Sequence, residues 1–436
     1  MSVRVIGAGL AGCEAAWQLA CHGILTDLYE MKPCRFSPAH RSENLAELVC
    51  SNSLKAERIE SACGLLKEEM RRLGSLLVPC AYACRVPAGG ALAVDRDAFS
   101  KTVTEKVISQ PSICLHREEI TEIPSDGLNI IATGPLTPNA LASKIFQMFG
   151  GSLSFFDAAA PIVTAESLDY SKVFAASRYN RGEDNAYLNC PMNEEEYEAF
   201  YHALLSAERA PIHGFDTADP KVYEGCMPIE VMAGRGENTL RFGPMKPVGL
   251  RDPKTGHRPW AVLQLRREDK RGSMYNLVGF QTNLKFGEQK RVFGMIPGLG
   301  HAEFVRYGVM HRNTFLNSPA ILSTDFRVKS KPNLFFAGQI TGVEGYMESA
   351  SSGILAGINA ARSLEGKGQY LPPETTMTGA LCRYVANGGE GPFQPMGSNF
   401  GILPPLSEKI RDKRERYSAL SERALKDLQL SLDCLI

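Results

Sequence analysis

The hydrophobic pattern at the start of the chain predicts a strand, a tight turn and a helix. Residues 3–6 form a short apolar run, three glycines follow within residues 7–12, and residues 11–22 carry apolar side chains at helical spacing. A second strand is predicted over 26–30, and it ends in an acidic residue. A strand, a helix and a strand in this order are typical of a βαβ unit in a parallel sheet.

Later apolar runs extend this pattern and indicate that one domain uses both ends of the chain. Residues 128–133 (LNIIAT) and 333–337 (NLFFA) each predict a buried strand, and a helix is predicted from about Ala350 in ASSGILAGINAARSL. If these segments join the first unit, the middle of the chain is an insertion. We therefore expect an α/β protein with a Rossmann-like, doubly wound domain and an inserted α+β domain.

Within this organisation, residues 193–209 predict an amphipathic helix capped by Asn193. Residues 240–272 predict a long hairpin or loop, because they combine Pro and Gly with many charges. Apolar residues from Ser407 onward recur at helical spacing and predict a C-terminal helix. The expected segments are 1–160 for the first part of the doubly wound domain, 161–325 for the insertion, and 326–436 for the second part with the C-terminal helix.

The glycines Gly7, Gly9 and Gly12 match G-x-G-x-x-G, a pattern that is too common to establish a ligand by itself. Glu30 ends the second strand at about the distance where a βαβ unit places a carboxylate beside the ribose of a dinucleotide. The helix that follows the glycines offers N–H donors and a positive dipole end to a pyrophosphate. Dinucleotide binding is therefore favoured over an incidental glycine-rich turn.

The choice between FAD and NAD depends on residues 333–362. In flavoproteins with two such motifs, a late helix directs its N-terminus at the part of the flavin where reduction builds negative charge. This favours FAD, and the alternative is one more strand and helix without a ligand. The candidate cofactor-binding residues are Gly7, Ala8, Gly9, Leu10, Ala11, Gly12, Glu30, Gly338, Gln339, Ser351 and Gly353.

Composition and charge mainly exclude classes of partner. The 48 basic residues balance 48 acidic residues, so a polyanionic partner must use a local patch. The 12 cysteines show neither a C-x-x-C pair nor histidines at zinc spacing, and we expect no metal site. Without a long apolar run or a signal-peptide layout, we expect no membrane partner and a cytoplasmic protein with reduced cysteines.

Two cysteines differ from the rest because they lie at predicted turns. Cys50 is in LVCSNSLK and Cys226 is in YEGCMP. At a turn, a thiolate can meet backbone donors and be reached by a substrate. From composition alone, each would still more often be a core cysteine than a nucleophile.

Around these cysteines the sequence resembles a known family, the bacterial folate- and FAD-dependent tRNA (uracil-5)-methyltransferases, TrmFO. The resemblance covers nearly the whole chain in family order, and CSNS and EGCMP are far more specific than the glycine motif. The matching stretches are GAGLAG, LVCSNSLK, GLLKEEMRRLGSLL, VPAGGALAVDRDAFS, YEGCMPIEVMAGRG, RFGPMKPVGLRDPKTG, NLVGFQTNLKFGEQKRVF, PNLFFAGQITGVEGYMESASSGILAGINAA and FQPMGSNFGILPP.

The resemblance implies transfer of the methylene carbon of methylenetetrahydrofolate to C5 of the T-loop uridine at position 54 of tRNA. It implies FAD as cofactor, NADH or NADPH as reductant, and the T arm of tRNA as partner, with no obligate protein partner. A thiolate that adds to uracil C6 makes C5 nucleophilic, and a second base must then remove the C5 proton. We assign Cys226 as nucleophile and Cys50 as base or one-carbon-handling thiol, and the reverse order stays open.

Four further residues are candidates for substrate contacts. Glu344 is a candidate for a bond to a pterin edge and Tyr346 for stacking, whereas His311 and Arg312 are candidates for pterin and glutamate contacts. For each, the alternative is a polar residue that supports a loop. Nine Lys or Arg residues against three acids in 241–271 form either a phosphate-contacting patch or scattered charge on a solvated loop.

Three other functions compete with the methyltransferase. A related flavoprotein modifies the wobble uridine of tRNA, but it needs a partner protein and a long helical C-terminal domain, for which little chain remains after the second FAD motif. A small-molecule NAD(P)H:FAD oxidoreductase would not need Cys50 or Cys226. An RNA-binding flavoprotein without enzymatic activity would bind tRNA but form no methyl product.

Overall fold

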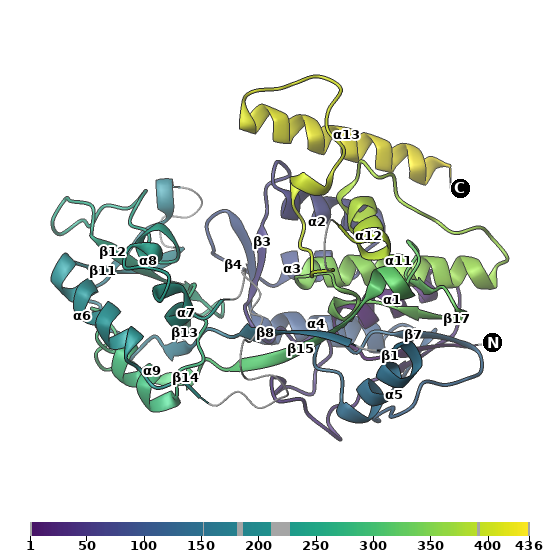
Figure 1. Ribbon diagram of the computed structural model, residues 1–436, viewed down its shortest axis with the longest axis horizontal. Coiled ribbons are helices and arrows are strands. Elements are labelled where there is room, and N and C mark those ends of the chain that lie inside the picture. Colours follow the sequence, from purple (N-terminus) through teal and green to yellow (C-terminus); the bar gives the residue numbers. More distant parts are fainter. Residues whose placement is uncertain (1, 151, 181–185, 211–226, 390–392, 435–436) are drawn as a thin grey trace.

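The computed structural model describes residues 2–150, 152–180, 186–210, 227–389 and 393–434, and these residues form two lobes (Figure 1). The lobe that carries both ends of the chain contains a six-stranded sheet in the order β16-β17-β7-β1-β2-β6. All its neighbouring pairs are parallel except β16 with β17. The strands are β1 (Val3–Ile6), β2 (Thr26–Tyr29), β6 (Ile113–His116), β7 (Leu128–Ile131), β16 (Arg327–Val328) and β17 (Lys331–Phe336).

The position of β17 beside β7 confirms that a late segment returns to the first βαβ unit. Residues 334–336 pair with 129–131, next to β1. Helices α1, α4 and α11 pack against the strands, and α5 lies on the other side of the sheet in Figure 1. The helices of this lobe are α1 (Leu10–Cys21), α2 (Ala62–Arg72), α3 (Leu77–Ala83), α4 (Arg96–Ile108), α5 (Asn139–Phe149), α10 (Ser318–Ile321), α11 (Tyr346–Leu364), α12 (Met377–Asn387) and α13 (Lys413–Asp433).

The other lobe is built on an antiparallel sheet in the order β10-β11-β12-β13-β9-β14. Helix α6 begins after Asn193, whose side chain forms a capping box with Glu196, as the sequence predicts. The elements of this lobe are β9 (Ile162–Thr164), β10 (Phe174–Ala175), β11 (Tyr187–Met192), α6 (Glu194–Leu205), α7 (Ile229–Ala233), α8 (Thr239–Phe242), β12 (Ala261–Arg267), β13 (Met274–Leu277), α9 (Phe286–Phe293) and β14 (Phe304–Arg306).

Strand β12 corrects the predicted hairpin or loop over 240–272. Its seven residues lie in the middle of the sheet, and all except Arg267 are buried. The charges misled the interpretation, because Arg266 is itself buried and donates to Asn52 and Ser51 of the other lobe. Because β12 is buried on both faces, and the buried Arg266 is paired with residues of the other lobe, its sequence does not show the alternation of apolar and polar residues expected of a half-buried strand.

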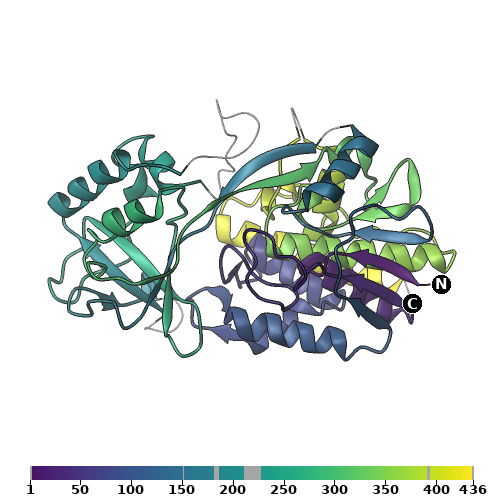
Figure 2. The same cartoon turned by 90° about the horizontal axis from the view of Figure 1, so that it is seen from below.

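Two antiparallel strands run between the lobes, β8 (Ser152–Ala158) and β15 (Met310–Leu316). Figure 2 shows them side by side, so the chain leaves the first lobe and returns to it along one ribbon. The two largest hydrophobic cores follow this division: one draws on residues 3–145 and 316–428, and the other on 163–302. The boundaries 1–160, 161–325 and 326–436 stay a prediction.

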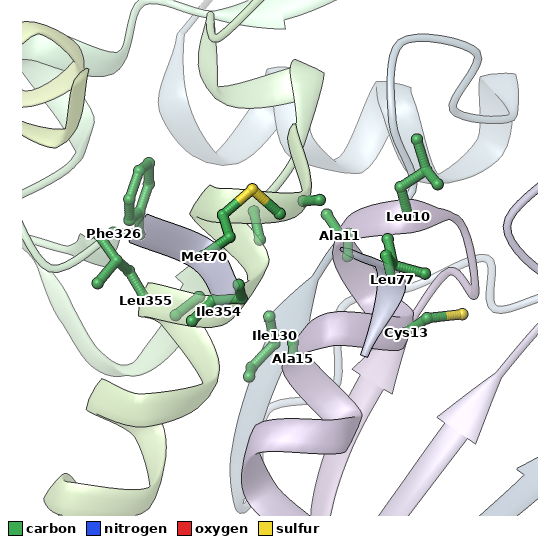
Figure 3. Packing of buried hydrophobic residues seen from close by; sticks show 14 of the residues in the cluster. Leu10, Ala11, Cys13, Ala15, Met70, Leu77, Ile130, Phe326, Ile354 and Leu355 are labelled. Carbon is green, nitrogen blue, oxygen red and sulfur yellow. The ribbon is translucent and has the colours of Figure 1, made fainter. Parts of the chain in front are cut away.

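Two glycines of α11 allow an unusually close approach to α1. A Cβ at Gly353 would lie 2.1 Å from the carbonyl oxygen of Ala11, and one at Gly357 would lie 2.7 Å from that of Ala15. Ala11 and Ala15 belong to the buried core that Figure 3 shows, together with Ile354 of α11. Small residues therefore hold the first and last parts of the chain together at the sheet.

Two buried carboxylates each cap the N-terminus of a helix that is remote in the sequence. Glu69 of α2 accepts hydrogen bonds from the backbone N–H groups of Met377 and Thr378, both at 2.8 Å, at the start of α12. Glu14 of α1 does the same for Leu76 and Leu77 at the start of α3. Burial raises the pKa of each carboxyl to about 7, against the hydrogen bonds, which lower it.

We predict that Gly353→Ala destabilises the protein by roughly 2–3 kcal/mol, because the added methyl group forces α11 away from α1. Gly287→Ala is the matched control, since α9 contains Gly287 and a Cβ there would meet no atom within 4 Å. That change should stay within about 1 kcal/mol of the wild type. Urea unfolding followed by circular dichroism measures both, and equal stabilities of the two variants would contradict the packing argument.

We predict that Glu69 makes the free energy of unfolding fall as the pH rises. A carboxyl whose folded-state pKa is raised to about 7 contributes stability below its ordinary pKa of 4.5, and this contribution is lost as the pH rises through 7. The loss is at most about 3 kcal/mol. Urea unfolding between pH 5 and pH 8 should show a smaller fall in Glu69→Gln than in the wild type, whereas exposed Glu198→Gln on α6 should follow the wild type.

Candidate functional site

A cleft opens at the carboxyl ends of β1, β2 and β7, where ligands bind in doubly wound sheets. It encloses about 1090 Å³, including its open mouth. The glycine turn after β1 forms one wall, the turn after β17 contributes Gly338 and Gln339, and the first turn of α11 contributes Tyr346 and Ser349. The two ends of the sequence therefore meet at one cavity.

The glycine turn has the shape that a pyrophosphate requires. Gly7 has a φ of 98°, and a Cβ there would lie 2.6 Å from the carbonyl oxygen of Ala132 on the neighbouring strand. Gly9 has no atom within 4 Å of its Cβ position, so its backbone borders open space. Gly9 is also the N-cap of α1 and provides no side-chain cap, so the first N–H groups of that helix stay available to a ligand.

Glu30 lies at the other side of this turn with its carboxylate fixed by the backbone. One oxygen accepts from the N–H of Ala8 at 3.2 Å and the other from the N–H of Lys32 at 3.0 Å. The side chain is buried and lines the cleft. A carboxylate held in this way fits the ribose hydroxyls of a dinucleotide, as the sequence predicts.

The structure places the predicted cofactor-binding residues in two groups. Gly12, Ser351 and Gly353 do not line the cleft: a Cβ at Gly12 would meet the Gly7 carbonyl oxygen at 1.8 Å, and Gly353 packs on Ala11. Gly12 and Gly353 thus serve the packing of the turn and of the helices, and a part of all three residues in cofactor binding stays a prediction. The predicted residues that line the cleft are Gly7, Ala8, Gly9, Leu10, Ala11, Glu30, Gly338 and Gln339.

Several lining residues carry no signal in the sequence. His40, Glu47 and Glu118 come from irregular segments that reach the cleft only through the fold. Thr133 ends the predicted apolar strand and Gly134 follows it, so the strand-turn pattern could have indicated both. The other lining residues that the sequence analysis did not name are Ile6, Tyr29, Met31, Lys32, Ala46, Val49, Glu119, Ile120, Ala132, Pro135, Leu136, Pro138, Leu141 and Ser349.

Cys50 lies next to this cleft, in a loop that Tyr346 holds. The backbone N–H groups of Cys50 and Ser51 donate to the phenolic oxygen of Tyr346, at 2.7 and 3.1 Å. The Cys50 thiol is partly buried, 3.9 Å from the carbonyl oxygen of Ala158 at the end of β8. Val49 itself lines the cleft, so the cysteine loop and the dinucleotide site share a wall.

Three arginines also donate hydrogen bonds to the same loop. Arg96 donates to the carbonyl oxygens of Leu48 and Cys50, at 2.7 and 3.3 Å, and Arg306 donates to that of Val49. Arg266 donates to the side chains of Ser51 and Asn52, both at 2.8 Å. The loop is thus fixed by residues from both lobes.

The charge of this arginine cluster exceeds the negative charge beside it. In the described part of the chain, Glu268 is the carboxylate that pairs with Arg96, and neither Arg266 nor Arg306 forms an ion pair. Burial lowers the pKa of both Arg266 and Arg306, which reflects this incomplete compensation. The surplus positive charge favours an anionic group at the Cys50 loop.

The other catalytic candidate, Cys226, lies outside the described residues, which resume at Met227. His311 and Arg312 belong to β15, where their backbones pair with residues 157 and 156 of β8, and their side chains lie outside the described part. Glu344 is buried and accepts from Gln339 Nε2 at 2.6 Å. It therefore supports the turn that forms the cleft wall.

The basic segment 241–271 divides between structural and exposed charges. Arg241 stacks on Trp260, with its guanidinium carbon 3.6 Å from the ring centre, and Arg266 is buried beside the Cys50 loop. These two charges serve the fold. The exposed basic residues of the segment are Lys246, Arg251, Lys254, Arg258, Lys270 and Arg271. Contact of these side chains with phosphate stays a prediction.

None of the helices in the described ranges is both long and apolar enough to cross a membrane.

The fold of this chain is similar to that of a solved structure. GidA of Aquifex aeolicus, in its form II crystal, superposes with a TM-score of 0.68 at 17% identity and covers 98% of this chain, which spans 73% of that protein. At this identity the likeness shows the fold alone. It confirms the Rossmann-like α/β class expected from the sequence.

Comparison of sequences identifies the family. The family model described as Glucose inhibited division protein A matches residues 2–368. A protein of Lactobacillus delbrueckii subsp. bulgaricus is 58% identical over 428 residues, covering 98% of this chain and 97% of the relative, and one of Enterococcus faecalis is 59% identical over 425 residues, covering 97% of each. Both are named methylenetetrahydrofolate--tRNA-(uracil-5-)-methyltransferase TrmFO. The chain therefore belongs to the TrmFO family, within the wider family of Glucose inhibited division protein A.

Proposed function

We propose that the protein transfers a one-carbon unit from methylenetetrahydrofolate to C5 of the T-loop uridine at position 54 of tRNA. FAD is the cofactor, and NADH or NADPH is the reductant. The names of relatives at 58–59% identity support this reaction. The observation that carries it is the hydrogen bond from the backbone N–H of Cys50 to Tyr346, because Tyr346 lines the dinucleotide cleft and the candidate catalytic cysteine therefore lies next to it.

The residues of the cleft fit FAD. The turn at Gly7 and Gly9 and the start of α1 hold the pyrophosphate, and the fixed carboxylate of Glu30 holds the ribose. Gly338 and the start of α11 complete the wall at the far end of the cleft. When bound and reduced, FAD supplies the two electrons that turn a methylene group into a methyl group.

The two cysteines divide the work on the uracil ring. Cys226 adds to C6 as a thiolate, which makes C5 nucleophilic, and Cys50 then accepts the C5 proton or handles the one-carbon unit. The reverse assignment uses the same two thiols. The arginines around the Cys50 loop favour an anionic group of the substrate at this position, because their charge is only partly compensated by Glu268.

Folate and tRNA use the surfaces that border this centre. Glu344 and Tyr346, in the turn before and at the start of α11, and His311 and Arg312, on β15, are the proposed folate contacts. The exposed basic residues of 241–271 are the proposed phosphate contacts for the T arm. We propose that the enzyme works in the cytoplasm without a membrane, a metal or an obligate protein partner.

We predict that Cys50→Ala and Cys226→Ala each reduce methyl transfer by at least a factor of about 1,000, because a missing nucleophile or base leaves C5 unactivated. Cys21→Ala, at an exposed cysteine of α1, should keep full activity. The assay follows labelled carbon from methylenetetrahydrofolate into defined tRNA transcripts, with a transcript lacking U54 as substrate control. Full activity in either of the first two variants, or label arriving from S-adenosylmethionine, would overturn the proposal.

We predict that Glu30→Gln weakens FAD binding by roughly 10- to 100-fold, since hydrogen bonds to a charged group contribute about 1.5–3 kcal/mol. Asp97→Asn, at an exposed position of α4, should bind FAD like the wild type. Titration of the FAD-depleted proteins, followed by flavin fluorescence, gives both affinities. An unchanged dissociation constant for Glu30→Gln would show that the carboxylate does not contact the ribose.

A further inference from the structure

Tyr346 lines the dinucleotide cleft and is also hydrogen-bonded to the Cys50 loop. It is the first residue of α11, directly after Gly345, which has a φ of 123° and allows the sharp turn into the helix. The residue lines the cleft, and its phenolic oxygen receives the N–H groups of Cys50 and Ser51. A movement of the Tyr346 side chain would therefore move the oxygen to which the Cys50 loop is bonded.

The hydrogen bonds to Tyr346 hold backbone N–H groups of the loop, whereas the arginines hold its carbonyl oxygens. Arg96 and Arg306 donate to the carbonyl oxygens of Leu48, Val49 and Cys50. Within the described ranges, the N–H groups of Cys50 and Ser51 have no acceptor but Tyr346. Consecutive N–H groups that converge on one oxygen form a small concave site, and here the phenol occupies it.

The protonation state of the Tyr346 phenol is compatible with its accepting both N–H groups. Burial, and then the neighbouring Cys50, raises the pKa of Tyr346, so the hydroxyl group stays protonated. A neutral phenol accepts from both N–H groups without placing a negative charge beside Cys50. Phenylalanine has the same ring but no acceptor, so it would leave two N–H groups unpaired.

We propose that Tyr346 is a positioning residue that sets the direction of the Cys50 thiol according to whether the dinucleotide cleft is filled. A ligand in the cleft restricts the ring of Tyr346, and the two hydrogen bonds pass this restriction to the loop. The catalytic consequence rests on the proposed function, but the coupling between cleft and thiol does not. This positioning role differs from the role predicted from the sequence, in which Tyr346 stacks on a substrate.

The test measures how fast iodoacetamide alkylates Cys50 in FAD-loaded and FAD-depleted protein. Mass spectrometry of the Cys50 peptide gives the rate, and the peptide with exposed Cys21 serves as internal reference. In the wild type, the two states should differ by a factor of about five or more. In Tyr346→Phe, that factor should fall below two, while the FAD affinity changes less than about fivefold.

Tyr384→Phe is the matched control, because Tyr384 also bonds the backbone through its hydroxyl, which donates to the carbonyl oxygen of Gln394 at 2.7 Å, but Tyr384 does not line the cleft. It should keep the alkylation factor of the wild type. A Tyr346→Phe protein that keeps this factor would overturn the proposal. Equal alkylation rates in loaded and depleted wild type would overturn it as well, and that comparison needs no variant to fold.

Methyl transfer gives an independent second measurement. If the proposed function holds, Tyr346→Phe lowers kcat by about tenfold or more and leaves the KM for tRNA within a factor of about two. An unchanged kcat would contradict the positioning of a catalytic thiol. Absence of methyl transfer in the wild type would refute the proposed function alone, because the alkylation factor would still report the coupling.

Discussion

The contact between α1 and α11 is the constraint on which the site depends. At Gly353 and Gly357 the two helices lie so close that a methyl group would collide with backbone oxygens. This contact brings the N-termini of both helices to the same edge of the sheet. Helix α1 begins there at the glycine turn, and α11 begins there at Tyr346. A dinucleotide cleft made by residues more than 300 positions apart in the sequence therefore follows from small residues on two helices.

The second organising feature is the Cys50 loop, which gathers donors from both lobes. Arg96 and Tyr346 belong to the lobe with the parallel sheet, whereas Arg266 and Arg306 belong to strands of the antiparallel sheet. These hydrogen bonds tie the orientation of one lobe to the geometry of the loop. A buried arginine is costly without a partner, and each of these arginines finds partners in backbone or side-chain oxygens of the loop.

The sequence predicted the fold class and the cleft because both depend on local patterns. The positions of Gly7, Gly9 and Glu30 follow from the strand-turn-helix arrangement, and the structure shows them around one cavity. The same pattern could not separate a glycine that faces the cleft from one that packs on neighbouring backbone, as Gly12 does on Gly7 and Gly353 on Ala11, because both need the absence of a Cβ. The arginines around Cys50 escaped prediction since only the tertiary fold brings them to the loop.

The ribbon of β8 and β15 has a consequence for how such a protein can change in evolution. The two strands are antiparallel neighbours, so the antiparallel lobe begins and ends at adjacent points of the first lobe. An element attached in this way can be lengthened, replaced or removed without cutting the parallel sheet. The parallel sheet, and the cleft at its edge, thus stay intact whatever the length of the chain between β8 and β15.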